Sequence, residues 1–167
     1  MRKFLGKFEE ESQFDNVPQT WIMFRYAEIL LNFAEAQNEY AGPSEEIYDA
    51  IKALRKRAGI EPGANGYYGL KIGMNQNEMR EVIRNERRLE LAFEEHRYYD
   101  IRRWKIAHLI FNNDHAIRGL EITLRWGELV YDEITLPTVP FQMHQYLYPF
   151  SYSECAKNGN LIQNPGW

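Results

Sequence analysis

The most constraining feature of this 167-residue chain is a segment near its start in which apolar residues cover most of a helix. Over residues 21–41 the polar side chains recur every three or four positions, which places them along one stripe of an α-helix. They are Arg25, Glu28, Asn32, Glu35 and Glu39. Nearly every other position is apolar. The helix is therefore predicted to begin near Trp21 and to lie sandwiched between neighbours, with only its polar stripe in water.

A second helix follows after a very short connection. Gly42-Pro43 ends the first helix, Ser44 is a suitable N-cap for the next one, and Gly59 ends it. The buried face of the second helix is predicted from Ile47, Ile51, Leu54 and Ala58. A connection this short joins antiparallel neighbours, so these two helices are predicted to form a helical hairpin.

A long charged helix is predicted next. Residues 60–77 are rich in Gly and Pro and indicate a loop. A helical pattern then runs from about Asn77 to Ala107. Glu86 falls on its apolar stripe, where a buried carboxylate needs a partner. The interleaved acidic and basic residues indicate a structural ion-pair network that locks this helix against the hairpin.

The remainder of the chain has a different pattern. Ile122–Trp126 and Leu129–Tyr131 are candidate strands, and several prolines keep them short. The tail from Tyr146 onward is expected to be mostly extended or turned. The predicted fold class is mainly α in one domain, with an irregular lead-in at 1–20, a helical part at 21–107 and an irregular aromatic tail at 108–167.

Composition excludes several function classes. A net charge of −4 argues against a nucleic-acid partner. The single Cys155 allows neither an internal disulfide nor a thiolate zinc site, and the four histidines lack ligand spacing. There is no Gly-rich phosphate loop, so neither a metal nor a cofactor is expected. No apolar run is long enough to cross a bilayer, and no secretion signal is recognised at the N-terminus.

Three blocks, in this order, resemble the SusD/RagB family of nutrient-binding lipoproteins. They are residues 25–36 (RYAEILLNFAEA) with 53–59 (ALRKRAG), residues 83–94 (IRNERRLELAFE) with 96–104 (HRYYDIRRW), and residues 146–149 (YLYP) with 160–167 (NLIQNPGW). The resemblance covers the chain from about residue 24 to its end.

The resemblance implies both a fold and a function. Members of the family look like mostly helical proteins with tetratricopeptide-like helix pairs, and the hairpin at 21–59 is expected to be one of these. They are lipoproteins on the outer face of the outer membrane. They work with a SusC-like TonB-dependent transporter and bind oligosaccharides or other nutrients without catalysis.

The chain departs from the family pattern in two ways. Family members are several hundred residues long, with a signal peptide and a lipidated N-terminal Cys. This chain is therefore expected to be a C-terminal fragment or the product of a split reading frame. Because the N-terminal half is missing, the helix at 21–41 is expected to expose an apolar patch where that half packs. In addition, Glu95 stands where a Gly is typical before His96. This predicts either a straighter helix or backbone strain.

Aromatic residues outside the helices are the best candidates for ligand contact. Sugar faces carry C–H patches that pack on flat rings, and the surrounding hydroxyls need hydrogen-bond partners. Tyr67 and Tyr68 lie in the Gly/Pro loop, and Trp126 and Tyr131 lie in the irregular region. These four residues are the predicted glycan-stacking positions. Trp104 and Trp167 fall within the family blocks and are expected to be packing residues.

Two alternatives remain. A tetratricopeptide-like scaffold that binds a protein fits the hairpin, although only one such hairpin is visible. A glycan hydrolase needs two carboxylates facing each other across a sugar. Glu86, Glu90 and Glu94 lie four apart on one helix face, and nothing in the sequence places an opposing acid. Non-catalytic binding is therefore the favoured function.

Overall fold

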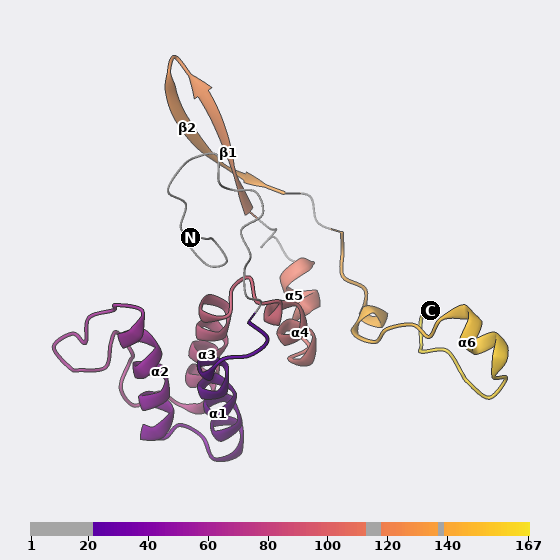
Figure 1. Cartoon of the computed structure of the whole chain (residues 1–167), viewed down its shortest axis with the longest axis horizontal. Helices are drawn as coiled ribbons and strands as arrows, with labels where there is room; N and C mark the ends of the chain where they lie inside the picture. Colours follow the sequence, from indigo (N-terminus) through magenta and orange to yellow (C-terminus); the bar gives the residue numbers. More distant parts are fainter. Residues whose placement is uncertain (1–21, 113–117, 137–138) are drawn as a thin grey trace. The chain divides into compact units, whose positions relative to one another are not determined.

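The computed structural model describes residues 22–112, 118–136 and 139–167 and is mainly helical, as predicted (Figure 1). Its chain divides into two compact units, with the boundary between Arg97 and Tyr98. The elements are α1 (Tyr26–Ala41), α2 (Glu45–Arg57), α3 (Gln76–Glu90), α4 (His96–Arg103), α5 (Ala107–Phe111), β1 (Arg118–Arg125), β2 (Glu128–Thr135), the 3-10 helix η1 (Met143–Tyr146) and α6 (Tyr152–Lys157).

The first unit contains the predicted helical hairpin, made by α1 and α2. Helix α1 ends at Gly42, and α2 is preceded by Ser44, whose side chain makes no capping hydrogen bond. The predicted start near Trp21 is wrong for the described residues, because α1 begins at Tyr26 after Arg25 in extended backbone. Residues 22–24 are apolar and continue the helical pattern although they are not helical, so periodicity could not locate this end.

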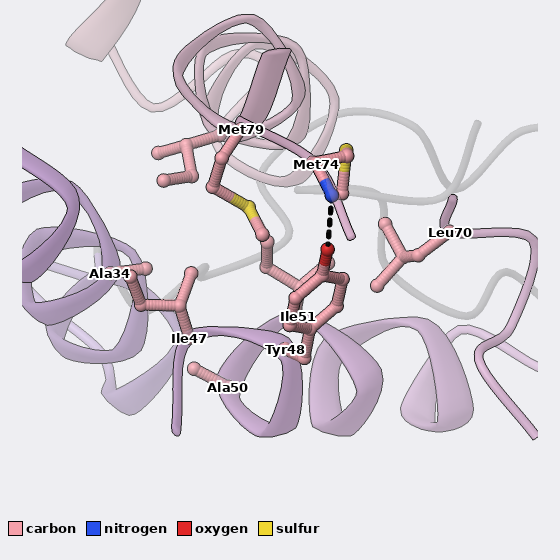
Figure 2. Packing of buried hydrophobic residues seen from close by; sticks show 9 residues of the cluster. Ala34, Ile47, Tyr48, Ala50, Ile51, Leu70, Met74 and Met79 are labelled. Atoms are coloured by element: carbon pink, nitrogen blue, oxygen red, sulfur yellow. Dashed lines mark hydrogen bonds between the residues drawn. The ribbon is translucent and has the colours of Figure 1, made fainter. Parts of the chain in front are cut away.

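The core of the first unit lies where α2 packs against α1 and α3. Ile47, Ile51 and Met79 are fully buried there. Figure 2 shows the ring of Tyr48 among these side chains, with its hydroxyl oxygen accepting the Met74 N–H at 3.1 Å. The same hydroxyl donates to the carbonyl of Lys71 at 3.1 Å. One tyrosine therefore fastens the loop between α2 and α3 onto the core.

The predicted long helix from Asn77 to Ala107 is wrong, because it is broken twice. Helix α3 starts with a capping box between Asn75 and Glu78 and stops at Glu90. Phe93 and Glu95 then adopt left-handed backbone with φ of 63° and 65°. Of the two outcomes expected for Glu95, the structure therefore has the strained one. Lys105, at φ 54°, separates α4 from α5.

The second unit has a small aromatic core and a β-hairpin. Ile101, Ala107 and Phe141 form the core, and the Phe141 ring stacks on Phe111 at 6.2 Å. The two candidate strands are confirmed and are longer than predicted. They pair antiparallel over their whole length, from Arg118↔Thr135 to Arg125↔Glu128.

The C-terminal tail is only partly extended, because it also contains η1 and α6. Side chains of the last residues bond to the backbone of residues 144–150. Asn164 Nδ2 donates to the Tyr148 carbonyl at 2.6 Å, and Gln163 Nε2 donates to the Phe150 carbonyl at 2.9 Å. Trp167 Nε1 donates to the Leu147 carbonyl at 3.1 Å. These bonds give Trp167 the packing role expected of it.

Candidate ligand-binding surfaces

The polar stripe of α1 was expected to lie in water, but it bonds to α3 instead. Both Nε and Nη2 of Arg80 donate to the Glu39 carboxylate at 2.6 Å. Arg87 Nη1 donates to Asn32 at 2.6 Å, and Arg87 Nε lies 3.7 Å from Glu35. The stripe is therefore an interhelix contact, and the Arg80 guanidinium holds the pKa of Glu39 below its ordinary value.

The N-terminal end of α1 is bonded in the same way. Arg25 Nε donates to Glu94 at 2.8 Å, and its Nη1 donates to Glu90 at 2.5 Å. Arg57 of α2 also reaches Glu90, at 2.5 Å. The hydrogen bonds that Arg25 donates to Glu94 raise the pKa of Arg25. The predicted ion-pair network between the hairpin and α3 is confirmed.

Glu86 is buried and paired, as its position on the apolar stripe required. Arg55 Nε donates to Glu86 at 3.0 Å, and Arg55 Nη2 also binds this carboxylate. Arg55 Nη1 donates to the Tyr68 carbonyl at 2.8 Å, which ties the Gly/Pro loop to the same pair. The carboxylates of Glu86, Glu90 and Glu94 are thus all paired with arginines of α2 or with the arginine that precedes α1.

The expected apolar patch is present on α1. Tyr26, Ile29, Phe33 and Tyr40 are all exposed and recur at helical spacing along one flank, which we call the α1 flank. Beside it, a hollow of about 390 Å³ opens between α1 and α2 and is lined mainly by apolar atoms of residues such as Leu30. This surface suits the packing of another helix more than a polar ligand.

Tyr67 and Tyr68, two of the predicted ligand residues, lie in the loop after α2. The Tyr67 ring packs edge-on against Tyr48 at 5.4 Å, with the Lys52 ammonium 4.8 Å from its centre. Its hydroxyl lies 3.2 Å from Glu45. Tyr68 is half-buried at φ 52°. The Tyr67 ring is therefore close to the first unit's core and its charged rim.

Trp126 and Tyr131, the other two predicted ligand residues, belong to the β-hairpin. Trp126 is not in a strand as expected; it forms the two-residue turn with Gly127, and both have positive φ. This is the type I′ geometry that fits the strand twist. The side chain of Trp126 is 99% exposed. Tyr131 lies in β2 opposite Ile122 and is 58% exposed.

One face of this hairpin is apolar. Side chains alternate between the two faces of a strand, and the register pairs Ile122 with Tyr131 and Leu124 with Leu129. Together with Leu120, all of these residues are exposed. The other face carries polar residues such as Glu121 and Asp132. The structure therefore brings Tyr131 into an exposed apolar strip that the sequence pattern did not reveal.

A second aromatic group in this unit was not predicted as a site. The hydroxyls of Tyr98 and Tyr148 lie 2.6 Å apart, and the ring of Tyr99 packs edge-on against Tyr98 at 5.2 Å. The Arg102 guanidinium lies 3.4 Å from the centre of the Tyr98 ring. We call these four residues the tyrosine–arginine cluster. Tyr98 and Tyr148 are 50 positions apart, so no local signal in the sequence could have joined them.

Among the described residues, no group of three or more His, Cys, Asp or Glu side chains is placed to hold a metal ion. Nor is any helix in that part of the chain both long and apolar enough to cross a bilayer.

Comparison with known proteins identifies similar sequences. The model of the SusD family matches residues 1–167. The SusD-like protein P2 of Formosa agariphila is 36% identical over 149 residues, which is 88% of this chain and 26% of that protein. The SusD-like protein P25 of the same organism is 41% identical over 85 residues, or 51% of this chain and 15% of that protein. The chain thus spans about a quarter or less of the length of these relatives.

Two solved structures have a similar fold. A SusD-like protein from Bacteroides fragilis matches with a TM-score of 0.71 and 32% identity, over 88% of this chain and 26% of that one. A SusD homolog from Bacteroides thetaiotaomicron matches with a TM-score of 0.65 and 26% identity, over 93% of this chain and 30% of that one. The helical hairpin and the elements after it therefore follow a known architecture.

Proposed function

Because this chain belongs to the SusD family, we propose that it is part of a non-catalytic glycan-binding component of an outer-membrane nutrient-uptake system. In this proposal the complete protein is a cell-surface lipoprotein that delivers oligosaccharide to a SusC-like TonB-dependent transporter. The chain contributes a C-terminal portion, with a ligand-contacting hairpin centred on Trp126 and Tyr131.

The main support for ligand contact by the β-hairpin is the unfavourable position of Trp126. A non-glycine residue at φ 51° costs about 1–2 kcal/mol, and Asn-Gly fits a type I′ turn at lower cost. The fully exposed indole also gains nothing from burial. Tryptophan at this position therefore costs free energy in the backbone of the turn and in the hydration of its ring. A ligand that stacks on the indole would offset both costs and so explains the residue.

Binding without bond cleavage is supported by the state of the carboxylates. Glu86 is bonded to Arg55 of α2, and both Glu90 and Glu94 are bonded to Arg25, the residue that precedes α1. A general acid or nucleophile needs a carboxylate facing a substrate, with a second one across the sugar. These three groups instead join helices, so we assign them a structural role.

The α1 flank is where we place the N-terminal part of the longer protein. A terminal repeat of a helical array needs a polar outer face, whereas this flank presents Tyr26, Ile29, Phe33 and Tyr40 to solvent. The SusD-like protein P2 is about four times longer than the region that it shares with this chain, which leaves enough chain to cover the flank. Co-expressing the remaining part of the protein is expected to yield a stable complex that Phe33→Glu abolishes.

The test of glycan capture is a thermal melt of the chain across a panel of soluble oligosaccharides. A ligand that binds only the folded state must raise the melting midpoint. Trp126→Asn removes the ring but keeps a residue suited to the turn, so it is expected to abolish the shift while leaving the unliganded midpoint unchanged or higher.

Tyr152→Asn is the matched control, because Tyr152 is 90% exposed on α6 and lies in the same unit. It is expected to retain the ligand-induced shift. If Trp126→Asn and Tyr152→Asn both retain the ligand-induced shift, the β-hairpin is not the surface that contacts the glycan. If no glycan moves the midpoint of the unsubstituted chain, this portion does not carry the binding function.

A further inference from the structure

We propose that the tyrosine–arginine cluster of Tyr98, Tyr99, Arg102 and Tyr148 is a second sugar site, selective for sugars that carry a carboxylate or sulfate group. The inference rests on the proposed glycan-binding function and adds the chemical class of one ligand. It does not involve the hairpin, since none of the four residues belongs to β1 or β2.

The first argument is the unused charge of Arg102. Its hydrogen bond runs from Nη1 to the Tyr98 carbonyl at 3.0 Å, and within the described part of the chain it has no carboxylate partner. Its neighbour Arg103, in contrast, is held by Asp100 at 2.9 Å. A guanidinium with spare N–H groups and no counter-ion suits a carboxylate or sulfate ligand.

The second argument is the hydrogen-bond balance of the two phenols. Only one hydrogen lies between the hydroxyl oxygens of Tyr98 and Tyr148, so the hydroxyl that accepts this bond keeps its own hydrogen for another acceptor. This bond raises the pKa of Tyr148, while the charge of Arg102 acts in the opposite direction. Tyr148 thus stays protonated at neutral pH. The cluster offers donors, which matches an acceptor-rich ligand.

The third argument is the exposure of the rings. Tyr99 and Tyr148 are each more than half exposed, so their faces are available for the C–H patch of a sugar. Arg102 is fixed from two sides, by Tyr98 at 3.4 Å and by Phe141 at 5.3 Å from the ring centres. The cation is therefore pre-oriented beside the exposed rings, which lowers the entropy cost of binding.

The experiment is calorimetric titration of the purified chain with three probes of equal length: a galacturonate trisaccharide, a sulfated galactose trisaccharide and a neutral galactose trisaccharide. The two anionic probes are expected to bind more tightly than the neutral one, and their affinity is expected to fall with added salt. Arg102→Gln is expected to weaken anionic binding by about tenfold or more, because it removes a charge-assisted contact.

Two further variants make the result specific. Lys157→Gln removes a positive charge elsewhere in the same unit and is expected to leave the affinity within about twofold, because Lys157 is exposed and its ion pair is with Glu154. Tyr148→Phe keeps the ring, removes one donor and is expected to lose affinity for the anionic probes. If Arg102→Gln lowers the melting temperature too far for titration, the affinity of Tyr148→Phe for the anionic probes tests the site in its place.

Trp126→Asn separates this proposal from the previous one. Anionic binding that survives Trp126→Asn but is lost in Arg102→Gln supports the cluster. Anionic binding that depends on Trp126 and is unaffected by Arg102→Gln and Tyr148→Phe overturns the cluster and leaves the hairpin proposal intact. Equal affinity for neutral and anionic probes would also contradict the proposed selectivity for anionic sugars. Absence of binding by all three probes and by the wider glycan panel overturns both proposals.

Discussion

Ile51 and Leu124 are both aliphatic residues within regular elements, yet Ile51 in the first unit is fully buried whereas Leu124 in the second is 70% exposed. The difference extends to the units themselves. The first closes three helices over a core and binds its carboxylates with arginines. The second displays aromatic and aliphatic side chains on a two-stranded hairpin and on the tyrosine–arginine cluster. The first unit therefore buries its aliphatic side chains in a closed core, whereas the second leaves many of its own exposed.

The largest expected effect is a direct test of this difference. Ile51→Ala is expected to lower the free energy of unfolding by about 4 kcal/mol, because it leaves a cavity in a packed core. Leu124→Ala, its matched control, is expected to change it by less than about 0.5 kcal/mol. Urea unfolding followed by circular dichroism measures both. Similar losses for the two variants would mean that the hairpin's apolar face is covered in solution.

The second prediction concerns the buried pair of Glu86 and Arg55. Glu86→Gln is expected to lower the unfolding free energy by about 3 kcal/mol, since the Arg55 charge remains without its carboxylate. Glu81→Gln changes an exposed carboxylate on the same helix and is expected to cost less than about 0.5 kcal/mol. A Glu86→Gln protein of unchanged stability would contradict the structural role of this residue.

The third prediction uses the strained turn between α3 and α4. Glu95→Gly is expected to raise the unfolding free energy by about 1 kcal/mol, because glycine adopts φ 65° without a Cβ clash. Glu95→Ala removes the same charge but keeps the Cβ, and it is expected to give no gain. A thermal melt compares them. Equal effects of Gly and Ala would assign any change to the charge rather than to the backbone.

The smallest expected effect is a pH dependence at the contact between α1 and α3. Arg80 lowers the pKa of Glu39 from its ordinary 4.5, so the unfolded chain takes up a proton at this residue before the folded chain does. The stabilisation is therefore full above about pH 4.5 and is lost as the pH falls through the lowered value. Because Glu39 is partly exposed, the loss is small. Melts of the unsubstituted chain and of Glu39→Gln should converge on acidification.

Some of the candidate surfaces could be read from the sequence and some could not. The α1 flank is expected from the family resemblance, which implies that a missing N-terminal half packs against the helix at 21–41. The pairing of Glu86 was predicted because a buried carboxylate needs a partner. The identity of that partner, Arg55 from a different helix, depends on packing, which periodicity does not specify.

The sequence by itself determined the helical hairpin, the loop after it, the existence of two strands and the family. These features rest on local signals: periodicity, helix ends, turn residues and short motifs. Only the tertiary structure decided that the polar stripe of α1 bonds to α3, that the long helix breaks at Phe93 and Glu95, and that Tyr98 meets Tyr148. Each of these depends on residues far apart in the chain or on a backbone conformation that local preference disfavours, so the energy that selects it comes from contacts formed only on folding.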